Sequence, residues 1–223
     1  MGQAIGDILP LAIGVAISPV PIIAVILMLF SRQAAKNSFV FLLGWVLGLT
    51  AVGAIVLIFG SASSSDGGGS STASGIVRLA IGALFLLLAA RSWRSRPKKG
   101  EQAETPSWMS AIDDFTAAKS FGVAILLSAV NPKNLGLTIA ASSTIAAASL
   151  SSGQEIAVLA IFLLIASVTV AGPVIYYAIA RERAQRGLND LKAWLIDNNN
   201  TVMAVLMLVI GVKLVGDGIG ILA

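Results

Sequence analysis

The sequence predicts an all-α integral membrane protein with six transmembrane helices, arranged as two inverted three-helix repeats in which helices 1 and 4 are broken at proline. Three observations support this fold class. The 223 residues are 57% hydrophobic and only 12% charged, whereas soluble domains carry about 25% charged residues. Several apolar runs are long enough to cross the hydrocarbon core of a bilayer. Two of these runs contain a proline near their centre, directly after a helix-capping residue.

The lengths of the apolar runs predict six candidate spans along the chain. They cover residues 5–30, 38–60, 75–90, 120–147, 156–180 and 201–221. The spans divide the chain into a first three-helix repeat at residues 1–95, a basic loop with an interfacial helix at 96–118, and a second, inverted repeat at 119–223. Two amphipathic segments, 108–115 and 188–197, are expected to lie on the membrane surface. The alternative for both segments is an ordinary solvated loop.

Basic residues are concentrated on one side of the predicted bundle. Twelve of the fifteen lysines and arginines follow spans 1, 3 or 5, while the connections after spans 2 and 4 carry only Asp66 and Glu155. Cytoplasmic loops of membrane proteins are enriched in Lys and Arg. We therefore expect a multi-pass protein with basic loops in the cytoplasm and both termini outside.

The composition also excludes several function classes. The absence of His and Cys excludes thiol nucleophiles, Ser-His-Asp hydrolysis, disulfides and the usual zinc and iron sites. No phosphate-binding P-loop sequence is present, and no catalytic acid/base pair is visible. We expect no enzyme activity, no cofactor and no metal site. The net charge of +4 lies mostly in short loops, where it indicates topology rather than nucleic-acid binding.

The two broken spans share the signature of a helix start. Ser18 precedes Pro19 in the first span, and Asn131 precedes Pro132 in the fourth. Ser or Asn at the N-cap followed by Pro at the first helical position is typical of a helix beginning. Each span is therefore expected to consist of two half-helices that meet near the midplane. The alternative is that each proline only kinks its helix to shape packing.

Other positions match between the two halves. Thr50 and Gly53 in span 2 correspond to Thr169 and Gly172 in span 5. Because three spans separate corresponding positions, the second half must cross the membrane in the opposite orientation, which is the inverted-repeat design of secondary transporters. The half-helix N-termini then converge at the midplane. Their partial positive charge and free N–H groups suit an anionic or carbonyl-bearing ligand.

The predicted substrate-binding residues lie at or beside the breaks. They are Ser18, Pro19, Pro21, Thr50, Asn131, Pro132, Lys133, Asn134 and Thr169. A lysine in mid-membrane costs about 2.5–3.5 kcal/mol on insertion scales and is normally functional or paired. The counter-charge of Lys133 is expected to be a substrate anion, a lipid phosphate, Asp217, or the free carbonyls of the preceding half-helix.

Three further features concern single spans. Lys213 and Asp217 lie one helical turn apart in span 6 and predict either an internal ion pair or a role in gating or substrate contact. Arg78, near the outer end of span 3, is expected to extend its side chain to the interface. Gly44 and Gly48 have a spacing that permits close helix approach, either within the monomer or between the protomers of a homodimer.

Several motifs resemble those of a known family. They are Ser18-Pro19, the Asn131-Pro132-Lys133-Asn134 element with its flanking leucines, and residues 194–199 before span 6. These motifs are similar to those of the GAP family, the peptidoglycolipid- and sulfolipid-addressing proteins of mycobacteria and related actinobacteria, grouped with the lysine-exporter (LysE) superfamily. The resemblance extends over nearly the whole chain.

This resemblance implies a secondary transporter of the bacterial plasma membrane. It would export, or assist the export of, a cell-envelope glycolipid or other amphiphile, with membrane lipids and an amphiphilic or anionic substrate as its partners. In the lysine exporters the first-span element resembles Pro-Gly-Pro, whereas this chain has Pro19-Val20-Pro21. This departure argues against an amino-acid substrate.

Two other functions stay open at this point. One is export of a small solute such as an amino acid or inorganic ion, although a divalent cation would need carboxylates that the breaks do not carry. The other is a non-transporting membrane scaffold for lipid assembly, which docks a lipid synthase or a larger pump through the loop at residues 91–119. Deleting that loop while leaving the midplane residues intact separates scaffolding from transport.

Overall fold

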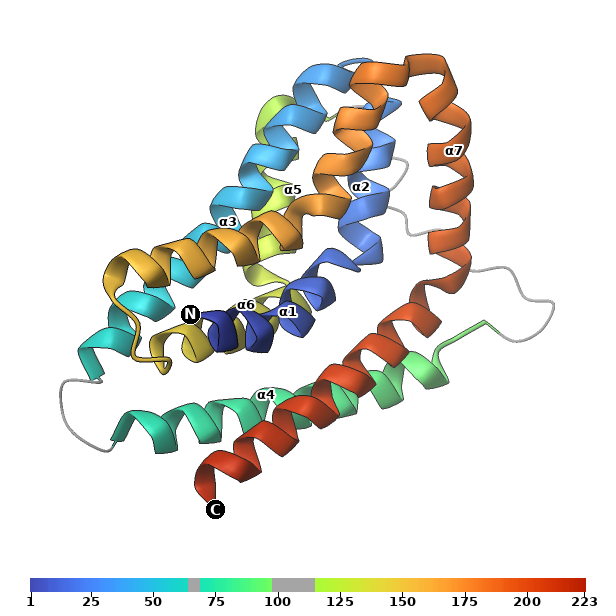
Figure 1. The fold of residues 1–223 in the computed structure, drawn as a ribbon. Helices are drawn as coiled ribbons and strands as arrows, with labels where there is room; N and C mark the ends of the chain where they lie inside the picture. The colour runs from blue at the N-terminus through green and yellow to red at the C-terminus, as the bar shows by residue number, and fades with distance from the viewer. Residues whose placement is uncertain (64–68, 98–114) are drawn as a thin grey trace.

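The computed structural model describes residues 1–63, 69–97 and 115–223, and each regular element in this part of the chain is a helix. The elements are α1 (Gly2–Ala16), α2 (Pro19–Leu29), α3 (Ala34–Ser63), α4 (Gly69–Arg94), α5 (Ala117–Ile125), the π-helical turn η2 (Leu126–Val130), α6 (Pro132–Ala146) and α7 (Ser152–Leu222). Figure 1 shows α1 and α6 below the upright α2, α3 and α5, with α4 and the last part of α7 as an antiparallel pair along the lower edge.

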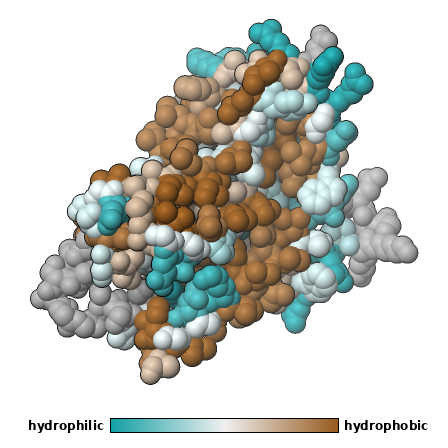
Figure 2. Space-filling model, in the orientation of Figure 1, coloured by the Kyte–Doolittle hydropathy of each residue, from teal (hydrophilic) through white to brown (hydrophobic). Residues whose placement is uncertain are grey.

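The helices have the length and composition of a multi-pass membrane protein. Four segments are long and apolar enough to cross a membrane, namely Ala34–Phe59, Gly75–Arg94, Ser152–Arg181 and Arg183–Leu222. Two helix pairs meet the same criterion together, so the described part of the chain has four candidate spans, or up to six if each bent pair is one span. Figure 2 shows apolar side chains over most of the visible face, with hydrophilic residues at its upper end, along its right edge and in one patch in its lower middle part.

The two predicted helix breaks are confirmed. The pair Gly2–Ala16 and Pro19–Leu29 bends by 51°, and the pair Ala117–Val130 and Pro132–Ala146 bends by 58°. Both breaks stand where the sequence has a capping residue followed by proline, because proline has no N–H to continue the hydrogen-bond ladder of the preceding helix. The core lies around these bent pairs, where α1, α3, α6 and α7 contribute to one cluster of buried apolar side chains.

Gly44 and Gly48 allow α3 to pack closely against α5 and η2 of the same chain. A Cβ atom at Gly44 would lie 2.9 Å from the backbone oxygen of Phe121, and one at Gly48 would collide with the Ser128 hydroxyl. The close approach that this spacing predicts therefore occurs within the monomer. The homodimer stays a prediction.

The second half of α7 includes the segment at residues 188–197, for which an interfacial helix is expected. This segment is helical, and Leu188 and Leu195 are buried in one cluster with Ile22, Ile23 and Ile26 of α2. Because α2 is apolar on all sides, this amphipathic segment covers one of them. Its position at the membrane surface stays a prediction. The other expected interfacial segment, 108–115, lies outside the described residues except for its last position.

Candidate functional site

The first helix break leaves backbone carbonyls that need partners in an apolar interior. α1 ends at Ala16, and its final carbonyls cannot bond to a continuing helix. The Thr169 hydroxyl donates to the Ala16 carbonyl at 2.5 Å, and the Lys133 ammonium donates to the Ile17 carbonyl at 3.1 Å. The Ala16 carbonyl also accepts from the backbone N–H of Ser18 at 2.8 Å. The second half of the chain therefore supplies the donor to the Ile17 carbonyl and a second donor to the Ala16 carbonyl.

The second break is satisfied by residues of its own loop and first turn. Asn131 separates η2 from α6, and its side-chain oxygen accepts a hydrogen bond from the backbone N–H of Lys133 at 3.0 Å. The Asn134 side-chain amide donates to the Leu127 carbonyl at 2.8 Å, and it lies 3.5 Å from the Ser18 hydroxyl. The two breaks are therefore in direct contact.

We call the hydrogen-bonded group at the two breaks the break cluster. It consists of Ala16, Ile17, Ser18, Leu127, Asn131, Lys133, Asn134 and Thr169. Pro19 and Pro132 occupy the first positions of α2 and α6, next to this cluster. Thr50 stands apart, because its hydroxyl donates to the Val46 carbonyl of its own helix at 2.7 Å.

The two half-helix beginnings are not equivalent. Asn131 caps α6 as predicted, but Ser18 makes no side-chain capping hydrogen bond to α2. An N-cap oxygen accepts from the backbone N–H of the second or third helical residue, and the third residue of α2 is Pro21, which has none. Pro19 also lacks this donor. The beginning of α2 therefore offers an anion fewer N–H groups than the sequence pattern predicts.

Lys133 is the buried cation of the break cluster. Only 2% of Lys133 is exposed to solvent. Among the side chains that the structure describes, the ion pairs involve only Arg78, Lys213 and Asp217. The preceding half-helix, which the sequence suggests as one source of a partner, is not the one that supplies it: the ammonium bonds to the Ile17 carbonyl at the end of α1. Asp217, another suggested partner, is paired with Lys213 and Arg78. A carbonyl stabilises an ammonium by a charge-assisted hydrogen bond, but it does not neutralise the charge.

A polar stripe on α6 continues from Asn134 of the break cluster, and its other two members, Thr138 and Ser142, were missed in the sequence. Asn134, Thr138 and Ser142 follow one another at four-residue intervals and are fully buried, because this spacing places them on one helix face. The spacing itself was the signal that could have revealed them. Within the described part of the chain, Asn134 Oδ1 and Ser142 Oγ have no hydrogen-bond partner. Buried polar atoms of this kind are costly, so a polar ligand there would be stabilised.

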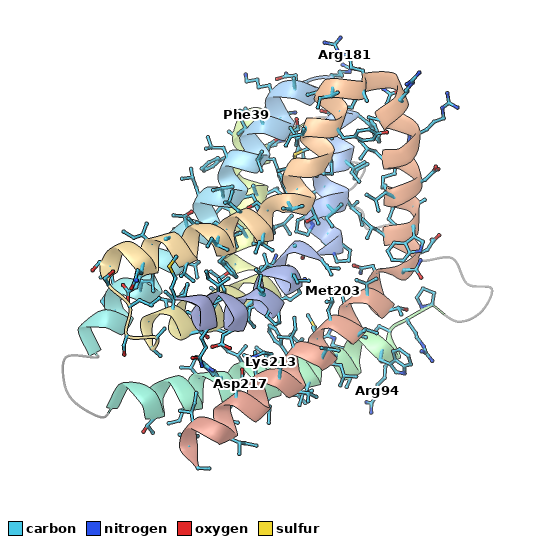
Figure 3. All side chains as sticks on the ribbon, viewed as in Figure 1. Phe39, Arg94, Arg181, Met203, Lys213 and Asp217 are labelled. Carbon is cyan, nitrogen blue, oxygen red and sulfur yellow. The ribbon has the colours of Figure 1, made fainter. Side chains whose placement is uncertain are left out.

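A second polar cluster joins α4, α6 and α7 away from the breaks. Lys213 Nζ lies 2.6 Å from Asp217 Oδ2, which confirms the predicted ion pair (Figure 3). The Arg78 guanidinium lies 3.8 Å from the same carboxylate and donates to the Thr144 hydroxyl at 3.0 Å. Only 13% of the Arg78 side chain is exposed, so its guanidinium is held by these two partners, and its extension to the membrane interface stays a prediction. A cavity of about 350 Å³, lined in part by Asp7 and Arg78, lies beside this cluster.

Comparison with known proteins assigns the family. The profile of the sulfolipid-1-addressing protein (Sap) family matches residues 8–220, a range that includes both helix breaks. Neither a curated protein nor a solved structure matches significantly. Together with the apolar helices, the family match indicates a membrane protein involved in lipid export. The motifs at the two breaks and the extent of this match lead to one conclusion: the chain belongs to the sulfolipid-1-addressing protein family.

Proposed function

We propose that this protein is a secondary transporter of the bacterial plasma membrane that exports, or assists in exporting, an anionic cell-envelope glycolipid or similar amphiphile. The observation that carries the proposal is the Lys133 ammonium, which is buried at a helix break and bonded to a backbone carbonyl. A buried cation without a carboxylate partner favours an anionic ligand, because uncompensated charge in a low-dielectric interior is costly. Transport, rather than enzyme chemistry, is the function that suits this site.

The proposed mechanism uses the contact between the two breaks. The Lys133 side chain ties α6 to the end of α1, and Asn134 approaches Ser18 of the same break. When an anionic headgroup takes the ammonium as its partner, the Ile17 carbonyl loses its donor and the two breaks are free to separate. Substrate binding then favours a conformation in which the cluster is open. The energy comes from a gradient or a partner protein, since the sequence has no P-loop.

Two inverted repeats would give this opening a direction. Under the proposal, residues 1–95 and 119–223 are related by a pseudo-twofold axis in the membrane plane that pairs Ser18-Pro19 with Asn131-Pro132. The similar bends at these positions, 51° and 58°, support this pairing. Rocking one repeat against the other would expose the break cluster to each side of the membrane in turn.

The direct test compares lipids at the cell surface with lipids inside the cell in a deletion strain. We expect one class of anionic amphiphile to fall at the surface and accumulate inside, and re-expression of the intact chain to restore the distribution. A variant lacking residues 98–114 serves as the control for scaffolding, because it leaves the break cluster intact. An unchanged distribution of every lipid in the deletion strain would contradict lipid export. Accumulation of a small solute inside these cells would instead favour the alternative, in which the protein exports an amino acid or inorganic ion.

The proposed orientation can be tested by labelling single cysteines. The chain has no native cysteine, so an impermeant thiol reagent has no background. We expect Ser151→Cys and Ala223→Cys to be labelled in intact cells, and Gly187→Cys, at an exposed position in the basic part of α7, only after permeabilisation. Labelling of Gly187→Cys alone in intact cells would invert the topology and reverse the direction of transport proposed above.

A further inference from the structure

A cavity of about 720 Å³ lies at the end of the molecule where α2 turns into α3 and where α7 kinks. Its walls are formed by the turn after α2, the first turns of α3 and residues 174–181 of α7. Figure 3 labels Phe39 and Arg181, which both line this cavity, toward the upper end of the molecule. None of the lining residues belongs to the break cluster, so this is a separate site.

The cavity is basic. Arg32, Lys36 and Arg181 line it together with Gln33 and Tyr177, and the described lining residues include no Asp or Glu. All three basic residues are exposed, so their charged groups are available to a ligand. Arg181 has φ 29° and ψ −96° at the kink of α7, a conformation that a side-chain-bearing residue rarely adopts. Such backbone strain is typically retained where a residue is needed at a functional position.

The same cavity opens onto an apolar stripe. Leu29, Phe39, Val174 and Ala178 line it beside the basic groups. Phe39 is 62% exposed, and Leu43 and Leu47 follow it on α3 at four-residue intervals, each 46% exposed. This spacing places the three side chains on one face of the helix. A charged pocket with an apolar stripe leading away from it matches a ligand with an anionic headgroup and a hydrocarbon chain.

We propose that this cavity takes up the headgroup of an anionic lipid from the leaflet that borders the basic end of the protein. Arg32, Lys36 and Arg181 bind the phosphate or sulfate, and the stripe from Phe39 to Leu47 receives the acyl chain. Arg side chains can bind two oxygens of such a group through two parallel hydrogen bonds. This inference rests on the proposed export function, because it makes the cavity the place where substrate is collected before it reaches the break cluster.

The experiment measures lipid binding separately from export. The intact purified chain is placed in phosphatidylcholine nanodiscs and titrated with phosphatidylglycerol, and bound lipid is counted by native mass spectrometry. The cavity variant combines Arg32→Gln, Lys36→Gln and Arg181→Gln. The matched control combines Arg91→Gln, Arg94→Gln and Arg186→Gln, which removes the same charge from exposed residues outside the cavity. We expect the cavity variant to bind phosphatidylglycerol about a hundredfold more weakly, and the control to bind it nearly as the parent does.

Three further measurements decide between outcomes. Inorganic phosphate at millimolar concentration should compete poorly, and equal competition would show that the site takes a soluble anion and overturn the lipid assignment. If phosphatidylglycerol binding is weakened equally in the cavity and control variants, the loss is caused by the change in net charge, and the proposed site is wrong. Export in cells should fall in the cavity variant, and undiminished export would overturn its role in substrate uptake. If the deletion strain exports normally while the cavity still binds phosphatidylglycerol selectively, the proposed function fails and the lipid site stands.

Discussion

Replacing Lys133 with methionine is expected to lower export about a hundredfold or more while the protein still accumulates in the membrane. Methionine keeps much of the length and apolar volume of lysine, so packing in the buried position is largely preserved. It removes the positive charge that the substrate anion needs in a site that is 2% exposed. Leaving one partner of a buried ion pair without its counter-charge costs about 3–5 kcal/mol. Export rate and membrane abundance are measured in the same cells.

Thr169→Val is the matched control for this prediction. It removes a donor to the Ala16 carbonyl, at the same break, without changing any charge. The loss of one neutral hydrogen bond is worth about 0.5–1.5 kcal/mol, so export should fall by about tenfold at most. If Lys133→Met exports at the parent rate, the substrate role of Lys133 is wrong. If Lys133→Met and Thr169→Val both fail to accumulate, both side chains serve chiefly to satisfy the carbonyls of α1.

Replacing Gly44 with leucine is expected to prevent stable packing of α3 against α5. The Cβ atom alone would lie 2.9 Å from the backbone oxygen of Phe121 and 3.0 Å from the Ala124 methyl group. A helix backbone cannot give way as a flexible side chain does, so the helices must separate along this contact. Overpacking a well-packed site costs about 1–3 kcal/mol, and leucine adds three carbons beyond the first. We expect a sharp loss of folded protein, measured as abundance in the membrane and as thermal unfolding in detergent.

Gly122→Leu provides the comparison on the facing helix. Gly122 lies on α5, but no atom stands within 4 Å of a Cβ atom built there. This substitution should therefore be tolerated. Equal damage from both leucines would mean that added bulk on this helix pair, rather than close contact at Gly44, causes the loss. Equal tolerance would mean that α3 and α5 are not packed as the structure shows.

The sequence predicts the helix breaks well because their cause is local. A proline after Ser18 or Asn131 interrupts the hydrogen-bond ladder whatever surrounds it. The missing capping hydrogen bond of Ser18 could also be predicted from neighbouring residues, since Pro21 has no N–H to donate to the Ser18 side chain. The spacing of Asn134, Thr138 and Ser142 on α6 was visible in the same way. These features follow from residues within one or two helical turns of each other.

Other features required the tertiary structure. Arg78 meets Thr144 across 66 positions of sequence, and no local pattern pairs them. The covering of α2 by Leu188 and Leu195 likewise depends on how α7 folds back after its kink at Arg181. The basic cavity combines Arg32 and Lys36 with Arg181, which the sequence identifies only as members of two cytoplasmic loops. In each case the residue types were informative, but their partners were set by helix packing.

The way in which α1 ends has a consequence for how the chain is made. The Ile17 carbonyl receives its donor from Lys133, 116 positions further along the chain, whereas the Ala16 carbonyl also accepts from the nearby Ser18 N–H. A ribosome completes the first span long before it has synthesised Lys133, so the Ile17 carbonyl must stay hydrated or be held by the insertion machinery until then. The break in the first span is therefore finished late in biosynthesis, and the first half of the chain cannot reach its mature form in the bilayer without the second.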